Sequence, residues 1–332
     1  MFSKLFSRQV AQTSTRETSS PVAEADGARV TREELLQLRY SVRDLPLDSR
    51  KAATSVISGA HVSRFRGRGM DYLESRGYQP GDDIRSMDWR VTARSGRAHI
   101  KVYQEERERP IVVMLDLGPG MFFATRGAFK SIIAARAAAL IAWAAVHSGD
   151  RVGALLYHGK HRELRPVGGQ RGALQLIRAL VEAADPANAA LSAEDTLNAA
   201  LLRLRRVVRP GSQIFIFSDF YNTDADSKQH LQFLRQHNDV IACQILDRLE
   251  LQPPPPGRYA VRYGERQGIL DTRSEGRRRA WLEHFAARRA AAEALMQQCA
   301  IPLIRLTTDD DVPGALRSAL SRPAHTPTEH AA

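Results

Sequence analysis

The sequence predicts an α/β protein with a doubly wound, mostly parallel sheet, preceded by a small β-rich segment. From Pro110 onward, continuous apolar runs of strand length alternate with stretches of helical length, the pattern of a parallel sheet covered by helices on both faces. From about Val56 to Arg109 the runs are short and alternating, glycines are frequent and no helical period is present. The chain has 332 residues, 43% of them hydrophobic and 26% charged, which is enough to bury a substantial core.

These patterns divide the chain into four segments. Residues 1–29 are rich in Ser, Thr, Ala and Glu without periodicity, so we expect them to be disordered, like the polar tail 322–332. Residues 30–109 should hold a first helix and the β-rich segment, and residues 110–321 the α/β domain.

The first helix is predicted from its capping signal and its leucines. Thr31 is the expected N-cap, and Glu34 three residues later completes a capping-box pattern before Leu35 and Leu36.

Strands and helices then follow one another through the α/β domain. Strands are predicted at 111–116, 152–157, 163–167 (an edge strand), 213–218, 239–246 and 302–306. Helices are predicted at 128–147, 172–184, 196–208, 227–237, 275–299 and 312–320, with a hairpin-like pair at 258–263 and 268–272.

Cysteine content and hydropathy point to a cytoplasmic protein without direct membrane insertion. Cys243 and Cys299 are far apart in sequence, so no disulfide framework is expected. The longest nearly apolar stretch, Ile132–Val146, is interrupted by Arg136, and the remaining Ala137–Val146 is too short to span a bilayer.

The net charge of +11 raises the alternative of a nucleic-acid-binding protein. The excess is arginine, scattered over several clusters that include Arg277, Arg278 and Arg279. No zinc knuckle, recognition helix or aromatic stacking platform accompanies these clusters, so we expect an ordinary basic surface and no nucleic-acid partner.

The stretch Arg76–Arg94 has an unusual density of arginine and aspartate around one tryptophan and a turn. Guanidinium and carboxylate groups form paired hydrogen bonds, so the stretch is expected to contain a charged network. The residues assigned to it are Arg76, Gly81, Asp82, Asp83, Arg85, Asp88, Trp89 and Arg94. The favoured interpretation is structural: the network locks the β-rich segment against the sheet domain, with Trp89 as hydrophobic anchor. The alternative is that Asp82, Asp83 and Arg85 form a partner-binding surface.

Two acids end predicted strands of the sheet. Asp116 and Asp219 each follow an apolar run, and Thr196 opens a helix between them. Ligands of doubly wound sheets gather at the carboxyl edge, where oxygen ligands of this kind suit Mg²⁺. The alternative is that both aspartates cap helices or turns, and position alone does not separate the two.

At this point the sequence resembles a known family. The Gly67–Tyr72 and Arg76–Arg94 motifs look like the signature of the bacterial DUF58 family, and the resemblance spans roughly residues 30 to 320. It implies a von Willebrand factor A-like, Rossmann-like domain in which Asp116, Thr196 and Ser218-Asp219 occupy the places of a metal-ion-dependent adhesion site. Such proteins are associated with MoxR-type AAA+ ATPases and are thought to act as binding adaptors in chaperone-like systems.

The adhesion-site pattern Asp-x-Ser-x-Ser is incomplete, because Gly118 and Gly120 stand where it has serines. The resemblance therefore implies a degenerate Mg²⁺ site of Asp116, Thr196 and Asp219 with weakened affinity, and we favour no metal. Gly118 and Gly120, with Ser218, are instead expected to form a partner-binding edge, since glycine lets another backbone come close.

The sequence thus predicts a non-enzymatic interaction adaptor that works with a MoxR-type AAA+ ATPase on an unidentified client protein. No catalytic residue and no further cofactor are expected, because no phosphate-binding loop or nucleophile elbow is present. The alternatives are a Mg²⁺- or Mn²⁺-dependent hydrolase that uses Asp116 and Asp219, and the basic nucleic-acid-binding protein considered above.

Overall fold

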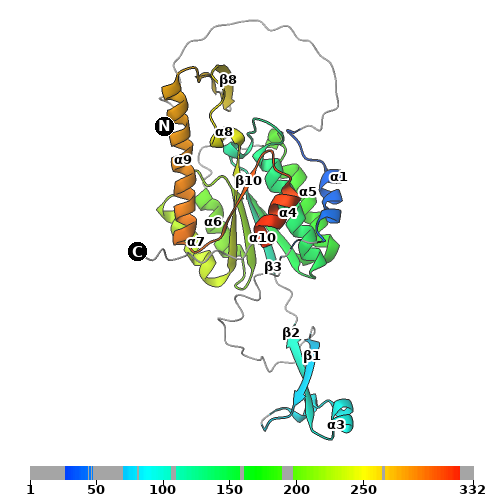
Figure 1. Ribbon diagram of the computed structural model, residues 1–332. Coiled ribbons are helices and arrows are strands. Elements are labelled where there is room, and N and C mark those ends of the chain that lie inside the picture. Colours follow the sequence, from blue (N-terminus) through cyan, green and yellow to red (C-terminus); the bar gives the residue numbers. More distant parts are fainter. Residues whose placement is uncertain are drawn as a thin grey trace, which may run out of the picture. The chain divides into compact units, whose positions relative to one another are not determined.

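The structure is a computed structural model whose chain divides into two units, residues Arg50–Glu108 and the remainder (Figure 1). It describes residues 27–43, 45, 47, 70–80, 82–105, 110–157, 161–188, 197–263 and 266–321. Residues 1–26 and the predicted tail 322–332 lie outside these ranges.

The larger unit is built on a six-stranded sheet. Its strands are β3 (Pro110–Asp116), β4 (Arg151–Tyr157), β5 (His161–Gly168), β6 (Gln213–Ser218), β7 (Asp239–Leu246) and β10 (Leu303–Thr307). They lie in the order β10-β7-β6-β3-β4-β5, and β5 at the edge is antiparallel to β4, whereas the other neighbours are parallel. The predicted doubly wound, mostly parallel sheet is confirmed.

Helices cover both faces of this sheet (Figure 1). One face carries α1 (Arg32–Gln37), α4 (Lys130–His147), α5 (Gly169–Ala183) and α10 (Val312–Ser321). The other carries α6 (Leu197–Val207), α7 (Ala225–His237) and the last turns of α9 (Glu275–Gln298). Successive residues of β3 alternate between these cores: Val113 packs on the first face and Met114 on the second. This two-sided burial explains why the strands are continuously apolar.

Shorter elements complete the larger unit. They are the 3-10 turns η2 (Leu38–Ser41), η4 (Pro119–Met121) and η5 (Pro186–Asn188), the helix α8 (Arg248–Leu251), and the hairpin β8 (Arg258–Tyr263) and β9 (Arg266–Asp271).

Helix α4 is the central core helix of the first face. By length and hydropathy alone it could cross a membrane, but 83% of it is buried inside the fold. Its all-round burial against the sheet and its neighbouring helices accounts for its apolar composition.

The first helix belongs to the sheet unit, which corrects its predicted grouping with the β-rich segment. The Trp143 indole of α4 donates to the Leu35 carbonyl at 3.0 Å, and Arg136 Nε donates to Glu34 Oε1 at 2.5 Å. Thr31 caps α1 as predicted, accepting from Glu34 N, but the Glu34 carboxylate binds Arg136.

The predicted disorder of residues 1–29 is wrong for its last residues. Phe129 N, just before α4, donates to the Gly27 carbonyl at 3.0 Å, so this part of the chain is held on the sheet unit.

The smaller unit contains the charged signature stretch. Strand β1 (Met70–Gly77) pairs antiparallel with β2 (His99–Glu105), and the chain between them forms η3 (Ile84–Ser86) and α3 (Trp89–Ser95). Asp88 caps α3 by accepting from Arg90 N and Val91 N, both at 3.2 Å. Ser75 Oγ of β1 donates to Asp88 Oδ2 at 2.7 Å, so this carboxylate joins strand and helix.

The tryptophan of this stretch is exposed in the smaller unit. Trp89 is the first residue of α3 and its surface is 68% exposed, so it is not buried within the smaller unit. Its role as an anchor against the sheet domain stays a prediction.

The other charged residues of the stretch shape the connection between β1 and α3. The Arg76 guanidinium donates to both Asp82 carboxylate oxygens at 3.0 and 2.8 Å, and Gln79 N donates to Asp82 Oδ2 at 2.8 Å. Asp83 Oδ1 accepts from Arg85 N at 2.9 Å, Arg94 lies in the last turn of α3, and Gly81 lies outside the described residues.

Candidate functional site at the carboxyl edge of the sheet

The carboxyl ends of β3 and β6 meet where the strand order reverses. After β3 the chain proceeds to β4 and β5 on one side, and it returns to β6 on the other side. Asp116 ends β3, Asp219 follows β6, and Ser218 Oγ donates to Asp116 Oδ2 at 2.6 Å. The structure therefore brings these three predicted site residues together at the position where doubly wound sheets bind ligands. Thr196 lies outside the described residues.

The turn after β6 is strained and well held. Phe220 has φ 55°, in the left-handed region that is uncommon for a bulky residue, and it is 1% exposed. Ser218 Oγ accepts from Phe220 N at 3.1 Å, and Gln244 Nε2 of β7 donates to the Asp219 carbonyl at 3.1 Å. Backbone strain held by surrounding hydrogen bonds often marks a functional site.

The Asp116 carboxylate is half-buried and is held between donors of its own chain. Its Oδ1 accepts from Gly118 N at 3.0 Å, and its Oδ2 accepts from Ser218. Burial, together with the negative charge of Asp219, raises the pKa of Asp116 to about 6. The hydrogen bonds from Ser218 and Gly118 oppose this shift only in part.

The Asp219 carboxylate occupies the space that a side chain at position 120 would need. Its Oδ1 accepts from Tyr221 N at 3.0 Å, and its Oδ2 lies 3.8 Å from Lys130 Nζ. A Cβ atom at Gly120 would come within 2.7 Å of Asp219 Oδ2, and one at Gly118 within 3.2 Å of Asp116 Oδ1. The two glycines are thus part of how these carboxylates are placed.

A buried lysine faces this edge, and sequence reasoning missed it. Lys130 is the first residue of α4, and its side chain is 1% exposed. Its ammonium donates to Glu250 Oε1 of α8, and Glu250 Oε2 accepts from Asp247 N at 2.8 Å. Burial raises the pKa of Glu250, although the positive charge of Lys130 opposes the shift. A lone lysine opening an apolar helix was the available signal.

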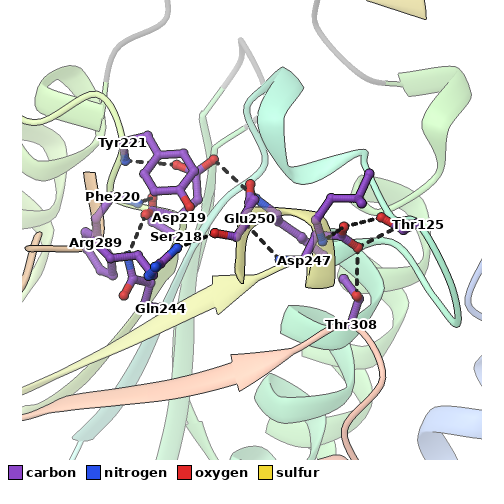
Figure 2. Close-up of polar contacts among 12 residues, drawn as sticks. Thr125, Ser218, Asp219, Phe220, Tyr221, Gln244, Asp247, Glu250, Arg289 and Thr308 are labelled. Carbon is purple, nitrogen blue, oxygen red and sulfur yellow. Dashed lines mark hydrogen bonds and ion pairs between the residues drawn. The ribbon is translucent and has the colours of Figure 1, made fainter. Parts of the chain in front are cut away.

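A further strand-ending acid, Asp247, continues the network along the edge. It follows β7 and accepts from Thr125 N and Thr308 Oγ1, both at 2.8 Å, and from Leu249 N at 2.9 Å. Burial raises the pKa of Asp247, but these hydrogen bonds outweigh it and the net pKa is lowered. Figure 2 shows Asp219, Glu250 and Asp247 following one another along the edge. Asp247 comes directly after an apolar strand, and this position in the sequence could have identified it as a candidate site residue, as the same position identified Asp116.

Aromatic and basic side chains of helix α9 lie beside the carboxylates of Asp219 and Glu250. Trp281 Nε1 donates to the Leu249 carbonyl at 2.7 Å, and Arg289 donates to the Glu250 carbonyl. The Tyr221 ring lies 5.2 Å from Lys130 Nζ and 5.1 Å from the Arg288 guanidinium carbon, within cation–π range. Burial and the nearby charges of Glu250 and Asp219 raise the pKa of Tyr221.

The described residues of the edge do not fit a divalent metal ion. Each carboxylate oxygen of Asp116 and Asp219 already faces an N–H, a hydroxyl or the Lys130 ammonium. Positions 118 and 120 carry no hydroxyl, and no cluster of three or more His, Cys, Asp or Glu that could hold a metal occurs in the described part of the chain. Mg²⁺ prefers an octahedron of free oxygen ligands, which this set does not offer.

An α/β domain with a charged strand edge, joined to a small unit with the arginine-aspartate signature, defines the class of this protein. The family described as "Protein of unknown function DUF58" matches residues 74–293, and the chain belongs to that family.

Curated relatives match over most of their length. The chain is 29% identical over 278 residues to the "Uncharacterized protein Rv1480" of Mycobacterium tuberculosis (strain ATCC 25618 / H37Rv), covering 83% of this chain and 86% of the relative. The "Uncharacterized protein Mb1516" of Mycobacterium bovis matches to the same extent.

Similar solved structures are more distant. They include the conserved hypothetical protein BatB from Bacteroides thetaiotaomicron, with a TM-score of 0.38, 14% identity, and coverage of 64% of this chain and 97% of that one. A von Willebrand factor type A protein from Catenulispora acidiphila has a TM-score of 0.35 and 14% identity, and 67% of this chain and 43% of that one are covered.

Two of the similar structures have descriptions that differ from the expected cytoplasmic location. One neighbour, from Bacteroides fragilis, is described as an aerotolerance-related membrane protein; it has a TM-score of 0.38 and 14% identity, and covers 64% of this chain and 96% of that one. Another, from Vibrio fischeri, is described as a membrane spanning protein. The cytoplasmic prediction rested on the cysteines and hydropathy of this chain alone, which do not fix a location, so it is not kept.

Proposed function

We propose that this protein is a non-enzymatic interaction adaptor that works with an AAA+ ATPase of the MoxR type in a chaperone-like or complex-maturation role. The observation that carries the proposal is the strand edge at the point where the sheet order reverses. There Asp116, Ser218 and Asp219 are held by hydrogen bonds within their own chain, while Gly120 is exposed. An ordered polar edge with an uncovered glycine suits the close approach of a partner's backbone.

The surroundings of the edge enlarge this binding surface. In α9 the buried residues are Ala292, Leu295 and Met296, all in its last turns, so its first turns extend beyond the sheet next to the β8–β9 hairpin (Figure 1). Leu251 of α8, Ile269 of β9 and Leu282 of α9 expose large apolar side chains in this region. Apolar side chains within a basic surface are typical of protein-binding sites.

The signature stretch of the smaller unit provides a second surface in this proposal. Ile84 and Trp89 are 61% and 68% exposed, although both are large and apolar. Exposed tryptophan is frequent among residues that dominate binding energy at protein interfaces. This exposure supports the alternative raised from the sequence, in which the Arg76–Arg94 stretch binds a partner.

Native affinity purification tests the proposal. The tagged wild-type protein is purified from its own cells in the presence of ATP, and bound proteins are identified by mass spectrometry. We expect a MoxR-type ATPase with the wild type and a clear loss with Leu282→Asp. Leu174→Asp on α5 is the matched control, because Leu174 is 38% exposed and Leu282 37%, and it should retain the ATPase. Absence of any ATPase with the wild type contradicts the proposal.

The two alternative functions predict other measurements. A hydrolase predicts Mg²⁺- or Mn²⁺-dependent phosphatase or nuclease activity that is lost in Asp116→Ala and in Asp219→Ala. A nucleic-acid-binding protein predicts retention on DNA that falls steeply with salt. The first result would make the strand edge a hydrolase site, and the second would make the basic surface a nucleic-acid-binding site. Either result contradicts the adaptor role.

A further inference from the structure

The charge balance of the strand edge is unusual, because a buried lysine stands at the start of a helix. Backbone N–H groups at a helix N-terminus carry a partial positive charge, so a cation there is unfavourable unless anions compensate it. Lys130 opens α4, and its side chain is 1% exposed. Removing an ammonium from water costs several kcal/mol, and close carboxylates must offset that cost.

Two carboxylates and one aromatic ring surround this ammonium. Lys130 Nζ donates to Glu250 Oε1 and lies 3.8 Å from Asp219 Oδ2, while the Tyr221 ring centroid is 5.2 Å away. Glu250 is fixed in turn through Asp247 N, and Asp219 through Tyr221 N. Lys130 therefore links Asp219 at the end of β6 to the Glu250–Asp247 network at the end of β7.

Position 120 completes the arrangement. Because Gly120 has no Cβ, Asp219 Oδ2 can occupy the space beside it, where an added Cβ would come within 2.7 Å. A serine at that position would force the carboxylate to move away from its present place, 3.8 Å from Lys130 Nζ. The missing serine and the buried lysine are therefore parts of one arrangement.

We propose that the ammonium of Lys130 is the resident cation of this strand edge and takes the place of a divalent metal ion. The edge is then held in one conformation permanently, and its order does not respond to the concentration of Mg²⁺, Mn²⁺ or Ca²⁺. This inference concerns the isolated protein and does not depend on the proposed adaptor role.

The first test measures the wild-type protein with and without metal. Thermal unfolding is recorded in EDTA and in millimolar Mg²⁺, Mn²⁺ or Ca²⁺, with calorimetric titration alongside. We expect melting temperatures that agree within about 1 °C and no saturable heat, since a ligand stabilises only in proportion to its binding. A rise of several degrees with Mn²⁺ that disappears in Asp219→Asn overturns the proposal.

The second test removes the ammonium and keeps the length of its side chain. Lys130→Met leaves Asp219 and Glu250 without their cation, and we expect the melting temperature to fall by about 10 °C. Lys228→Met on α7 is the control and should change it by no more than about 2 °C. A Lys130→Met protein as stable as the wild type overturns the proposal.

A double variant keeps the test decisive if Lys130→Met folds poorly. Lys130→Met with Glu250→Gln removes a positive and a negative charge together, so we expect it to recover part of the lost stability or of the soluble yield. A double variant no more stable or soluble than Lys130→Met overturns the role of Lys130 as a compensating cation.

Discussion

At the residue scale, the carboxylates at the edge of the sheet differ in which hydrogen-bond donors and cations compensate their charge. Asp116 uses a hydroxyl and a backbone N–H, Asp219 a backbone N–H and an ammonium, and Asp247 hydroxyls and backbone N–H groups. These environments shift their pKa values differently: the pKa of Asp116 is raised and that of Asp247 is lowered. Burial and the negative charge of Asp219 raise the pKa of Asp116, whereas the hydrogen bonds to Asp247 outweigh its burial.

The raised pKa of Asp116 predicts a pH-dependent stability. Its pKa of about 6 in the folded protein lies above the ordinary value of 3.8, so stability falls as pH rises from about 4 to 6 and stays lower above that range. The two values differ by about 2, which is worth up to about 3 kcal/mol. Asp116→Asn should therefore be more stable than the wild type at pH 7 and not at pH 4, as measured by urea unfolding. The exposed Asp226→Asn is the control, and an equal gain at both pH values would contradict this cause.

The two glycines of the edge predict unequal costs for the same substitution. A Cβ at Gly120 meets Asp219 Oδ2 at 2.7 Å, whereas one at Gly118 meets Asp116 Oδ1 at 3.2 Å. We expect Gly120→Ala to be about 1 kcal/mol less stable than Gly118→Ala in denaturant unfolding, because Asp219 must move away from its donors. Comparing the two variants cancels the shared effect of alanine on the unfolded chain. Equal stabilities would show that Asp219 relaxes freely.

At the element scale, short helices are placed by the carboxylates that cap them. Asp88 begins α3, and Asp247 begins α8 with a capping box in which Glu250 is the reciprocal partner. In α8 the same glutamate binds Lys130, so the cap of a four-residue helix also orients the anion beside the buried lysine. Capping here orients side chains of the candidate site as well as backbone.

Adjacent residues of the signature stretch are predicted to have separate roles. Asp88→Ala removes the cap of α3 and the acceptor of Ser75, so amide exchange in Trp89–Ser95 should accelerate about tenfold. Trp89→Ala should leave exchange in Arg90–Ser95 within about twofold of the wild type, because its side chain is exposed. If Trp89 belongs to a docking surface, its variant loses partner proteins in affinity purification while α3 stays protected. Rapid exchange in both variants would return Trp89 to a structural role.

At the scale of the whole molecule, the small unit is inserted between α1 and the sheet strands of one folding unit. Residues Met1–Ser49 group with Arg109–Ala332, and Arg50–Glu108 form the second unit. The sheet unit is completed by α1 across this insertion, through Leu35, Glu34 and Trp143.

This organisation predicts that the sheet unit folds without the insertion. Replacing residues 50–108 by a flexible Gly/Ser linker should keep cooperative unfolding of the sheet unit and shift its melting temperature by no more than about 3 °C. Deleting Arg32–Gln37 instead should cost more, because it uncovers α4 at Trp143. Loss of cooperative unfolding in the linker variant would show that the insertion is part of the sheet unit's core.

The sequence by itself determined the class of fold, the order of strands and helices, and the ends of β3 and β6 where Asp116 and Asp219 lie. Those features are local. A continuous apolar run of strand length predicts a strand buried on both faces of the sheet, and the last residue of a parallel strand lies at the carboxyl edge whichever strands are its neighbours. The capping role of Thr31 was predictable for the same reason.

Only the tertiary structure decided how that edge is neutralised. Lys130 and Glu250 are 120 residues apart in sequence, and no local sequence pattern predicts an ion pair between residues so far apart. The attachment of α1 to α4 likewise depends on packing between distant segments. A buried charge needs a partner of opposite charge, and which charged residues are buried together is decided only in the folded chain.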